Sequence, residues 1–204
     1  SCKFLGSSLT LINADVIARM PIDPTLYSKE GLDVYVRPQA GHTYCLVADV
    51  AKGVGGDYSA FQVIDITEVP YRIVAKYRKN DISPLLYPTV IYKIGKEYND
   101  AHLLIEINVS EQVAHILYNE LEYENFLFVN RHTNGQYVGG GFGGGKTQLG
   151  VNTDKKIKRI GCHNFKSLVE ENKLLITDAD TISEISTFIE KKGSYEADEG
   201  YHDD

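Results

Sequence analysis

Three consecutive apolar segments joined by short links constrain the fold of this chain more than any other feature of its sequence. They run from Tyr44 to Val50 (YCLVADV), from Ser59 to Ile66 (SAFQVIDI) and from Tyr71 to Arg78 (YRIVAKYR). Each is short, apolar and bounded by turn-forming residues, which is typical of strands. Because strands joined by short links pair with their neighbours in sequence, we expect an antiparallel meander.

After the meander, helix and strand patterns alternate. Helices are expected over Pro84–Tyr98, with Ser83 as N-cap, and over Ser110–Leu121. Strands are expected over His102–Ile107 (HLLIEI) and Phe126–Val129. Three antiparallel strands followed by helix-connected strands predict an α/β fold of the RNase H-like type (ribonuclease H/resolvase/integrase), with a mixed sheet.

The rest of the chain gives a coarser prediction. Residues 1–40 show no sustained period, so we expect an irregular arm or linker before one domain over residues 41–204. The stretch Thr133–Gly150 holds eight glycines and should be a mobile loop or a small hairpin. Helices with charged outer faces are expected over Phe165–Asn172 and Ile182–Lys192.

Composition excludes several classes of protein. The 204 residues suffice for one core, and no apolar run approaches the roughly 20 residues of a membrane span, so no membrane partner is expected. Cys2, Cys45 and Cys162 stand far apart and match no paired metal-ligand spacing, so neither a disulfide framework nor a zinc site is expected, which indicates a reducing compartment. The chain has no signal peptide pattern and stops without a cap or polar tail, so we expect a fragment of a protein that is not exported.

Two carboxylates stand inside apolar strands. Asp49 lies near the end of the first strand, and Glu106 follows Leu103-Leu104-Ile105. Burying a carboxylate is costly unless a cation pairs with it, and the expected topology places these strands side by side. A turn-forming or structural acid is the alternative for each residue taken alone. Asp203 and Asp204 provide a third acidic point late in the chain.

Three carboxylates on neighbouring elements suit Mg²⁺ or Mn²⁺, which prefer oxygen ligands, whereas zinc would favour His or Cys. Two such ions could activate a water and stabilise the leaving oxygen of a phosphodiester. Asp57, in the turn between the first two strands, and His202, beside the terminal acids, are expected to support the site. For Asp57, local hydrogen bonding in the turn is an equal alternative.

The segments Val47–Phe61 (VADVAKGVGGDYSAF), 103–108 (LLIEIN) and 199–204 (EGYHDD) resemble, in this order, the nuclease domain of T-even-type bacteriophage large terminases. The resemblance covers most of the chain, from about Phe4. It implies that Asp49, Glu106 and one of Asp203 or Asp204 are catalytic metal ligands. The implied activity is a metal-dependent endonuclease that cuts concatemeric double-stranded viral DNA during genome packaging.

The same resemblance implies an N-terminal ATPase domain on the same polypeptide, with the portal protein and the small terminase subunit as partners. It places the protein in the cytoplasm of the infected bacterial host, transiently docked on the viral procapsid. Two alternatives remain: another RNase H-like nuclease of the resolvase type, and a non-catalytic packaging module that binds DNA. A requirement for Mg²⁺ separates both nucleases from the binding module, and a preference for branched DNA identifies the resolvase.

Two further motifs bear on nucleotide and DNA binding. The stretch Gly140–Thr147 (GGFGGGKT) matches the phosphate-binding loop pattern, but no strand directly before it and no helix directly after it are expected, so we expect a loop beside the DNA instead. Although the net charge of −7 excludes an overall basic surface, a local basic strip can still contact phosphates. The candidate DNA-binding residues, for which a solvated surface is the alternative, are Lys155, Lys156, Lys158 and Arg159, joined by Lys146 and Arg131.

Overall fold

The computed structural model describes residues 10–52, 57–132, 135–138, 146–191 and 194–197, which form two compact units. The first, called here the sheet unit, comprises the described parts of residues 25–68 and 74–153. The second, called the helical unit, comprises the described parts of 1–24, 69–73 and 154–203. A single domain over residues 41–204 stays a prediction.

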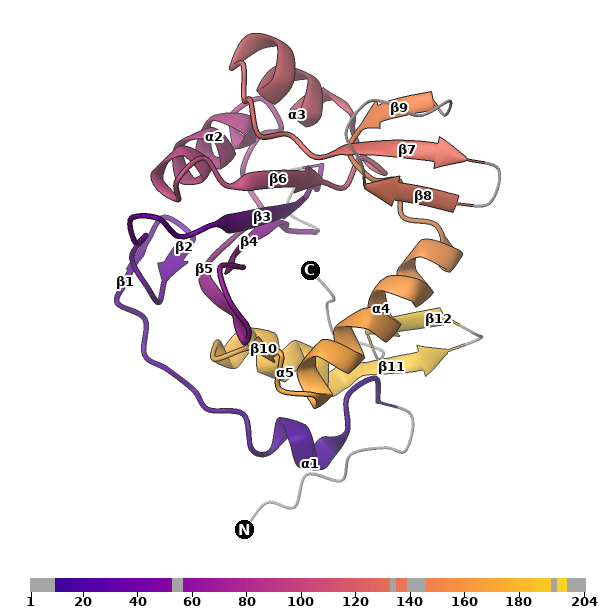
Figure 1. Cartoon of the computed structure of the whole chain (residues 1–204). Helices are drawn as coiled ribbons and strands as arrows, with labels where there is room; N and C mark the ends of the chain where they lie inside the picture. The colour runs from indigo at the N-terminus through magenta and orange to yellow at the C-terminus, as the bar shows by residue number, and fades with distance from the viewer. Residues whose placement is uncertain (1–9, 53–56, 133–134, 139–145, 192–193, 198–204) are drawn as a thin grey trace. The chain divides into compact units, whose positions relative to one another are not determined.

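A mixed sheet forms the centre of the sheet unit (Figure 1). Strand β3 pairs antiparallel with β4 and parallel with β6, and β4 also neighbours β5, so the expected meander and the crossover to the fourth strand are confirmed. The two short strands β1 and β2 within the first 40 residues extend the sheet beyond β5 and were not expected. The order is β1 (Tyr27–Lys29), β2 (Leu32–Val34), β5 (Tyr71–Lys79), β4 (Ser59–Asp65), β3 (Tyr44–Asp49) and β6 (His102–Ile105).

One face of this sheet carries the apolar core. In β3 every second residue, Tyr44, Leu46 and Ala48, is almost completely buried, as the period of a strand requires. Helix α2 (Tyr87–Glu97) covers this face, and the ring of Tyr87 stacks on that of Phe61 in β4, with 6.3 Å between the centroids. The helix therefore marks the apolar face, and alternate strand residues point to the opposite face.

The expected helices around β6 need two corrections. Helix α2 begins after its N-cap Leu86, because the Ser83 hydroxyl accepts a hydrogen bond from the Leu85 N–H in a turn that precedes the helix. The helix expected over Ser110–Leu121 is instead the short α3 (Gln112–His115), followed by the π-helix η1 (Ile116–Glu120).

The predicted fifth strand, Phe126–Val129, pairs in parallel with β6 of the main sheet at one residue only and then continues as a strand of a second sheet. Phe126 forms only an isolated bridge to Leu103, whereas β7 (Phe128–His132) pairs antiparallel with β8 (Gly135–Val138) and β9 (Lys146–Leu149). The described residues of the glycine-rich stretch therefore form two strands that both pair with β7, rather than a hairpin within the stretch.

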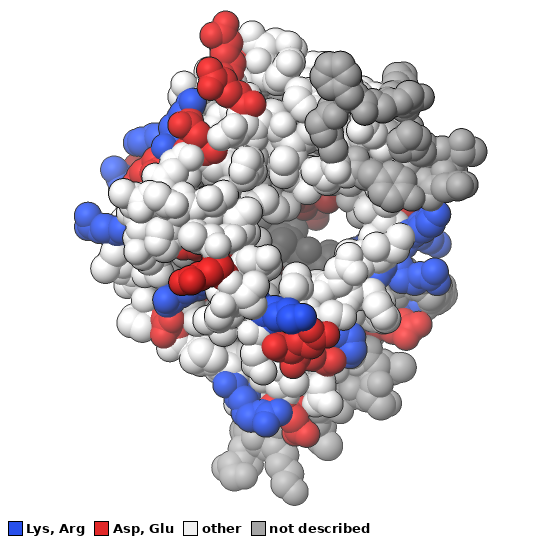
Figure 2. All heavy atoms as spheres, in the orientation of Figure 1, with Lys and Arg blue, Asp and Glu red and all other residues white. Residues whose placement is uncertain are grey.

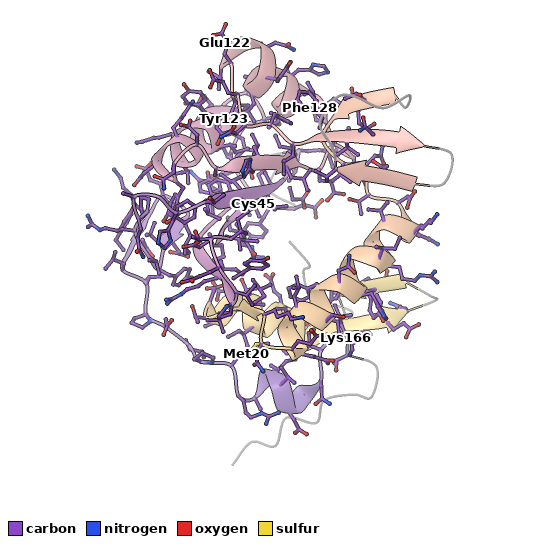
Figure 3. The ribbon with its side chains drawn as sticks, viewed as in Figure 1. Met20, Cys45, Glu122, Tyr123, Phe128 and Lys166 are labelled. Atoms are coloured by element: carbon purple, nitrogen blue, oxygen red, sulfur yellow. The ribbon has the colours of Figure 1, made fainter. Side chains whose placement is uncertain are left out.

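The helical unit contains α1 (Ala14–Ile17), α4 (Lys155–Glu170), α5 (Ala179–Thr187), the hairpin β11 (Phe188–Lys191) and β12 (Ser194–Ala197), and β10 (Leu174–Leu175), which pairs in parallel with Tyr71 and Arg72. Lys166 on α4, labelled in Figure 3, donates to the carbonyl of Leu11 at 2.7 Å. No helix in the described part of the chain is long and apolar enough to span a membrane.

Both expected helices of this unit have wrong boundaries. Helix α4 begins well before Phe165, because the Asp154 side chain caps it by accepting from the Ile157 N–H at 2.8 Å. Helix α5 ends at Thr187, where the expected helix over Ile182–Lys192 gives way to strand β11.

A short stretch, residues 150–153, extends the main sheet beyond β6 and is called here the edge segment. Val151 pairs in parallel with Glu106, donating to the Ile105 carbonyl at 2.8 Å and accepting from the Ile107 N–H at 2.9 Å. Glu106 is therefore held between two backbone neighbours, β3 and the edge segment.

Two amide side chains fix the end of the edge segment. Asn108 donates to the Thr153 carbonyl at 2.8 Å and accepts from the Thr153 N–H at 2.7 Å. Gln136 does the same for Asn152, at 2.6 Å and 3.1 Å. Each amide thus satisfies both backbone groups of one residue, as a neighbouring strand would.

Gly150→Ala should destabilise the protein. Gly150 has φ +100°, and an added Cβ would lie 2.5 Å from the Ile105 carbonyl oxygen. We expect a loss of about 2 kcal/mol or more in the free energy of unfolding, measured by urea denaturation. As a control, Gly161→Ala in α4, where an added Cβ meets no atom within 4 Å, should be stabilising by up to about 1 kcal/mol. Equal effects at both glycines would contradict this account of the edge segment.

Asn108→Ala should loosen the edge segment locally, because both hydrogen bonds to Thr153 are removed at about 1 kcal/mol each. Amide hydrogen exchange should show faster exchange at Thr153, while exchange in β4 stays unchanged. The control Asn119→Ala removes an exposed amide from η1 and should leave Thr153 protected. Unchanged exchange at Thr153 in Asn108→Ala would show that this side chain does not hold the segment.

Candidate functional site

Asp49 and Glu106 lie side by side in the structure. Asp49 ends β3 and Glu106 directly follows β6, whose register with β3 runs from Cys45 opposite His102 to Ala48 opposite Ile105. The Glu106 N–H donates to the Ala48 carbonyl at 2.8 Å, which continues the ladder by one residue. Because register partners in neighbouring strands lie about 4.8 Å apart and point to the same face, the two side chains are neighbours.

Both acids point to the face opposite α2, called here the acid face. Their side chains alternate with the buried core residues Ala48 and Ile105, and both acids are half-buried. Val47, two residues before Asp49 on the same face, is 40% exposed, so solvent reaches this part of the acid face. The predicted proximity of the two acids is confirmed by the strand register.

The negative charge of Asp49 acts on the layer beneath it. Tyr87 is completely buried on the apolar face and donates its hydroxyl to the carbonyl of Ala60, the register partner of Asp49 in β4. Burial raises the pKa of Tyr87 well above its usual value, and the charge of Asp49 raises it further. The Tyr87 hydroxyl therefore stays protonated, and it fixes the backbone opposite Asp49.

The acid pair has the chemistry of a site for a hard divalent cation. Its carboxylate oxygens suit Mg²⁺ or Mn²⁺ better than zinc, and a cation would offset the repulsion between two half-buried negative charges. Within the described residues, no group of three or more His, Cys, Asp or Glu side chains could hold a metal ion. The predicted third ligands, Asp203 or Asp204, lie outside the described residues, as does His202.

Asp57 lies in the link between β3 and β4 and is exposed, as expected for a turn residue. It belongs to no group of three or more metal-ligating side chains among the described residues. Its supporting role at the metal site stays a prediction.

The candidate DNA-binding residues fall on two separate elements. Arg131 in β7 and Lys146 in β9 are direct register partners, so the structure brings these two positions together. The other four lie in the first turns of α4, where Figure 2 shows Lys and Arg side chains gathering. These four are Lys155, Lys156, Lys158 and Arg159.

Within α4 the four cations are not equivalent. Lys155, Lys156 and Arg159 are exposed, whereas Lys158 is half-buried with its Nζ 5.5 Å from the centre of the Phe188 ring. Lys158 thus packs against β11 within the helical unit. The first turn of α4 contains no acidic residue, and the carboxylate of the N-cap Asp154 is the anion that the helix dipole favours at this end. Cations at this end cost stability, which an external anion such as phosphate would offset.

The phosphate-loop pattern at Gly140–Thr147 was expected to lack a strand before it and a helix after it, and only the second expectation holds. Strand β8 ends at Val138, directly before the pattern, and residues 139–145 lie outside the described part of the chain. Lys146 and Thr147 lie in strand β9, so no helix begins directly after the pattern. Among the described residues, therefore, no helix N-terminus follows the pattern to bind a nucleotide phosphate.

Sequence reasoning missed Asn108 and Gln136. Asn108 stands only two residues after Glu106, but nothing in a lone Asn indicates that it clamps a segment 45 residues away. Gln136 lies in the glycine-rich stretch, before its phosphate-loop pattern, and belongs to no motif that the sequence showed. Their roles depend on the tertiary position of residues 152 and 153, which only the structure provides.

Comparison with solved structures shows the same fold in phage large terminases. The large terminase nuclease of thermophilic phage G20c with bound magnesium is 16% identical, with a TM-score of 0.71 over 96% of this chain and 92% of that chain. The large terminase nuclease domain of Thermus phage P74-26 is 16% identical, with a TM-score of 0.59 over 89% and 83%. A large terminase from a further thermophilic bacteriophage is 11% identical, with a TM-score of 0.54 over 94% of this chain but 42% of its own.

These likenesses confirm the predicted RNase H-like α/β fold. A family model for the terminase RNaseH-like domain matches residues 46–204, which include both acids. The resemblance to large terminase nucleases is thereby confirmed, while the T-even type stays a prediction. The chain belongs to the terminase RNaseH-like domain family.

Proposed function

We propose that this chain is a metal-dependent endonuclease that cuts concatemeric double-stranded viral DNA during genome packaging. The observation that carries the proposal is the acid pair: Asp49 and Glu106 in register on the acid face of an RNase H-like sheet, in a chain of a terminase family. The large terminase nuclease of thermophilic phage G20c, crystallised with magnesium, with cobalt and with zinc, supports the use of a divalent metal.

Asp49, Glu106 and one of Asp203 or Asp204 would hold Mg²⁺ or Mn²⁺, and we propose two ions. Such ions, when bound, supply positive charge that polarises the scissile phosphodiester and makes water a stronger nucleophile. The protein's own part is to hold its carboxylates in place before substrate binds. The β3–β6 register fixes Asp49, and the edge segment with Asn108 fixes the backbone on the other side of Glu106.

The first turns of α4 are proposed to bind DNA phosphates. Lys155, Lys156 and Arg159 are exposed there, and their positive charges suit DNA phosphates. Arg131 and Lys146 are proposed as a second contact. Phosphate contacts carry no base information, so cleavage should depend little on sequence.

The wider setting follows from the family. We propose that an ATPase domain precedes this chain on the same polypeptide, and that portal protein and small terminase subunit are its partners. The protein would act in the cytoplasm of the infected bacterial host, docked transiently on the procapsid.

Glu106→Gln should abolish plasmid cleavage in Mg²⁺ while leaving the fold intact, because it keeps the side-chain volume and removes a metal-binding charge. Wild-type protein should cut linear duplex as well as plasmid, and the control Glu97→Gln, on α2, should cut normally. Retention of more than about a tenth of the cutting rate in Glu106→Gln, a loss of about 1.4 kcal/mol or less in transition-state stabilisation, would contradict the assignment. A strong preference for branched DNA would favour a resolvase, and duplex binding without any cutting would favour a packaging module.

Replacing Lys155 and Lys156 together by Glu should weaken duplex binding and flatten its salt dependence, by about 0.9 in the log–log slope for each phosphate that the protein no longer neutralises. Acids are favourable at a helix N-terminus, so the variant should be as stable as wild type or more stable, by about 0.3–1 kcal/mol per residue. Weaker binding at undiminished stability separates a DNA contact from damage to the fold. The control pair Lys29→Glu and Lys93→Glu, both exposed in the sheet unit, should change the slope less. An unchanged slope in the α4 variant would place the DNA elsewhere.

A further inference from the structure

The part of β5 that belongs to the sheet unit, residues 74–79, carries two cations on the acid face. Tyr77 in β5 stacks on Phe61 in β4, with 5.1 Å between the ring centroids, so Tyr77 belongs to the apolar face. Its neighbours Lys76 and Arg78 therefore point to the other face, the one that bears Asp49 and Glu106. No motif in the sequence had marked either residue.

Of the two cations, Arg78 lies at the same end of the sheet as the acid pair. Strands β3 and β5 flank β4 and are joined to it by short links, so they run in the same direction. Asp49 ends β3, and Arg78 is the last residue but one of β5. Lys76 lies two residues farther back, is 6% exposed, and has Asp33 3.9 Å from its Nζ.

The guanidinium of Arg78 is held over an aromatic ring. Its Cζ lies 4.0 Å from the centre of the Tyr58 ring, and Tyr58 stands two residues before Ala60, the register partner of Asp49. The backbone of Arg78 is fixed as well, since its N–H donates to the Gly31 carbonyl at 2.9 Å. Stacking on a ring orients the plane of a guanidinium, whose edge is suited to bidentate binding of phosphate.

The spacing matches a duplex backbone. Two strand spacings, about 10 Å, separate β3 from β5, with the small side chain of Ala60 between them. Successive phosphates on one DNA strand rise by about 3.4 Å. For a duplex whose axis runs across the strands of the sheet, a DNA strand with one phosphate at the acid pair has another phosphate opposite β5 within about three nucleotides.

We propose that Arg78, oriented by Tyr58, binds a non-scissile phosphate of the DNA strand being cut and so sets the register of that strand on the acid pair. This inference rests on the proposed nuclease function. Arg78 acts as a substrate-binding residue, and Tyr58 is a positioning residue that acts through it.

The test measures binding of a fluorescent linear duplex by anisotropy at several salt concentrations, in Mg²⁺ and in a Glu106→Gln background that leaves the DNA uncut. Arg78→Gln should weaken binding roughly tenfold, because a charge-assisted hydrogen bond is removed, and should lower the salt slope by about 0.9. Arg78→Lys should restore the slope but only part of the affinity, since the charge returns without the planar fork. The matched control Arg37→Gln changes an exposed arginine beside Glu97 and should alter neither quantity.

Tyr58 provides an independent arm, which decides the question if Arg78→Gln does not fold. Tyr58→Phe keeps the ring under the guanidinium and should bind like the parent, whereas Tyr58→Ala should bind more weakly. The role of Arg78 would be overturned if Arg78→Gln bound DNA with the affinity and salt slope of the parent. It would also be overturned if the two Tyr58 variants bound with equal affinity. Neither outcome would contradict the proposed nuclease function. Failure of the parent protein to bind duplex at all would instead overturn the proposed function.

Discussion

The parallel pairing of β3 with β6 is the constraint on which the rest of this structure depends. It forces Asp49 and Glu106 into register on one face, about one strand spacing apart. Two half-buried carboxylates so close repel each other, and a sheet chosen for stability alone would not place them there. The surrounding structure is built to hold them: the Tyr87 hydroxyl binds the backbone opposite Asp49, and the edge segment closes the other side of Glu106.

Much of this arrangement follows from short-range patterns in the sequence. The strands that carry Asp49 and Glu106 are apolar runs with clear turn signals, and their order dictates the meander and the crossover. Since the period of a strand is two residues, the burial of Ala48 and Ile105 already determines which way the acids point. The strands β3 to β6 and the proximity of Asp49 and Glu106 were therefore predictable, and the structure shows both, whereas the role of the two acids as metal ligands stays a prediction.

What the sequence could not provide depends on partners far away in the chain. Asn108 and Gln136 hold the edge segment only because the fold places Thr153 beside Asn108 and Asn152 beside Gln136. Helix α4 was predicted too short because Asp154, its N-cap, stands among polar residues that also suit a loop. The role proposed for Arg78 depends on two contacts: the stacking of Tyr77 on Phe61, which shows that Arg78 points to the acid face, and the stacking of Arg78 on Tyr58. Each case concerns tertiary contacts rather than local propensity.

The central claim is that Asp49 and Glu106 share a bound divalent cation. Crystals grown or soaked with Mn²⁺ test it directly, because manganese is located by its anomalous scattering. The account predicts an anomalous peak within about 2.0–2.6 Å of a carboxylate oxygen from each residue, the range spanned by hard-cation–oxygen bonds. The peak should disappear in crystals of Asp49→Asn. Manganese bound only elsewhere, or bound equally well without the Asp49 carboxylate, would contradict the account.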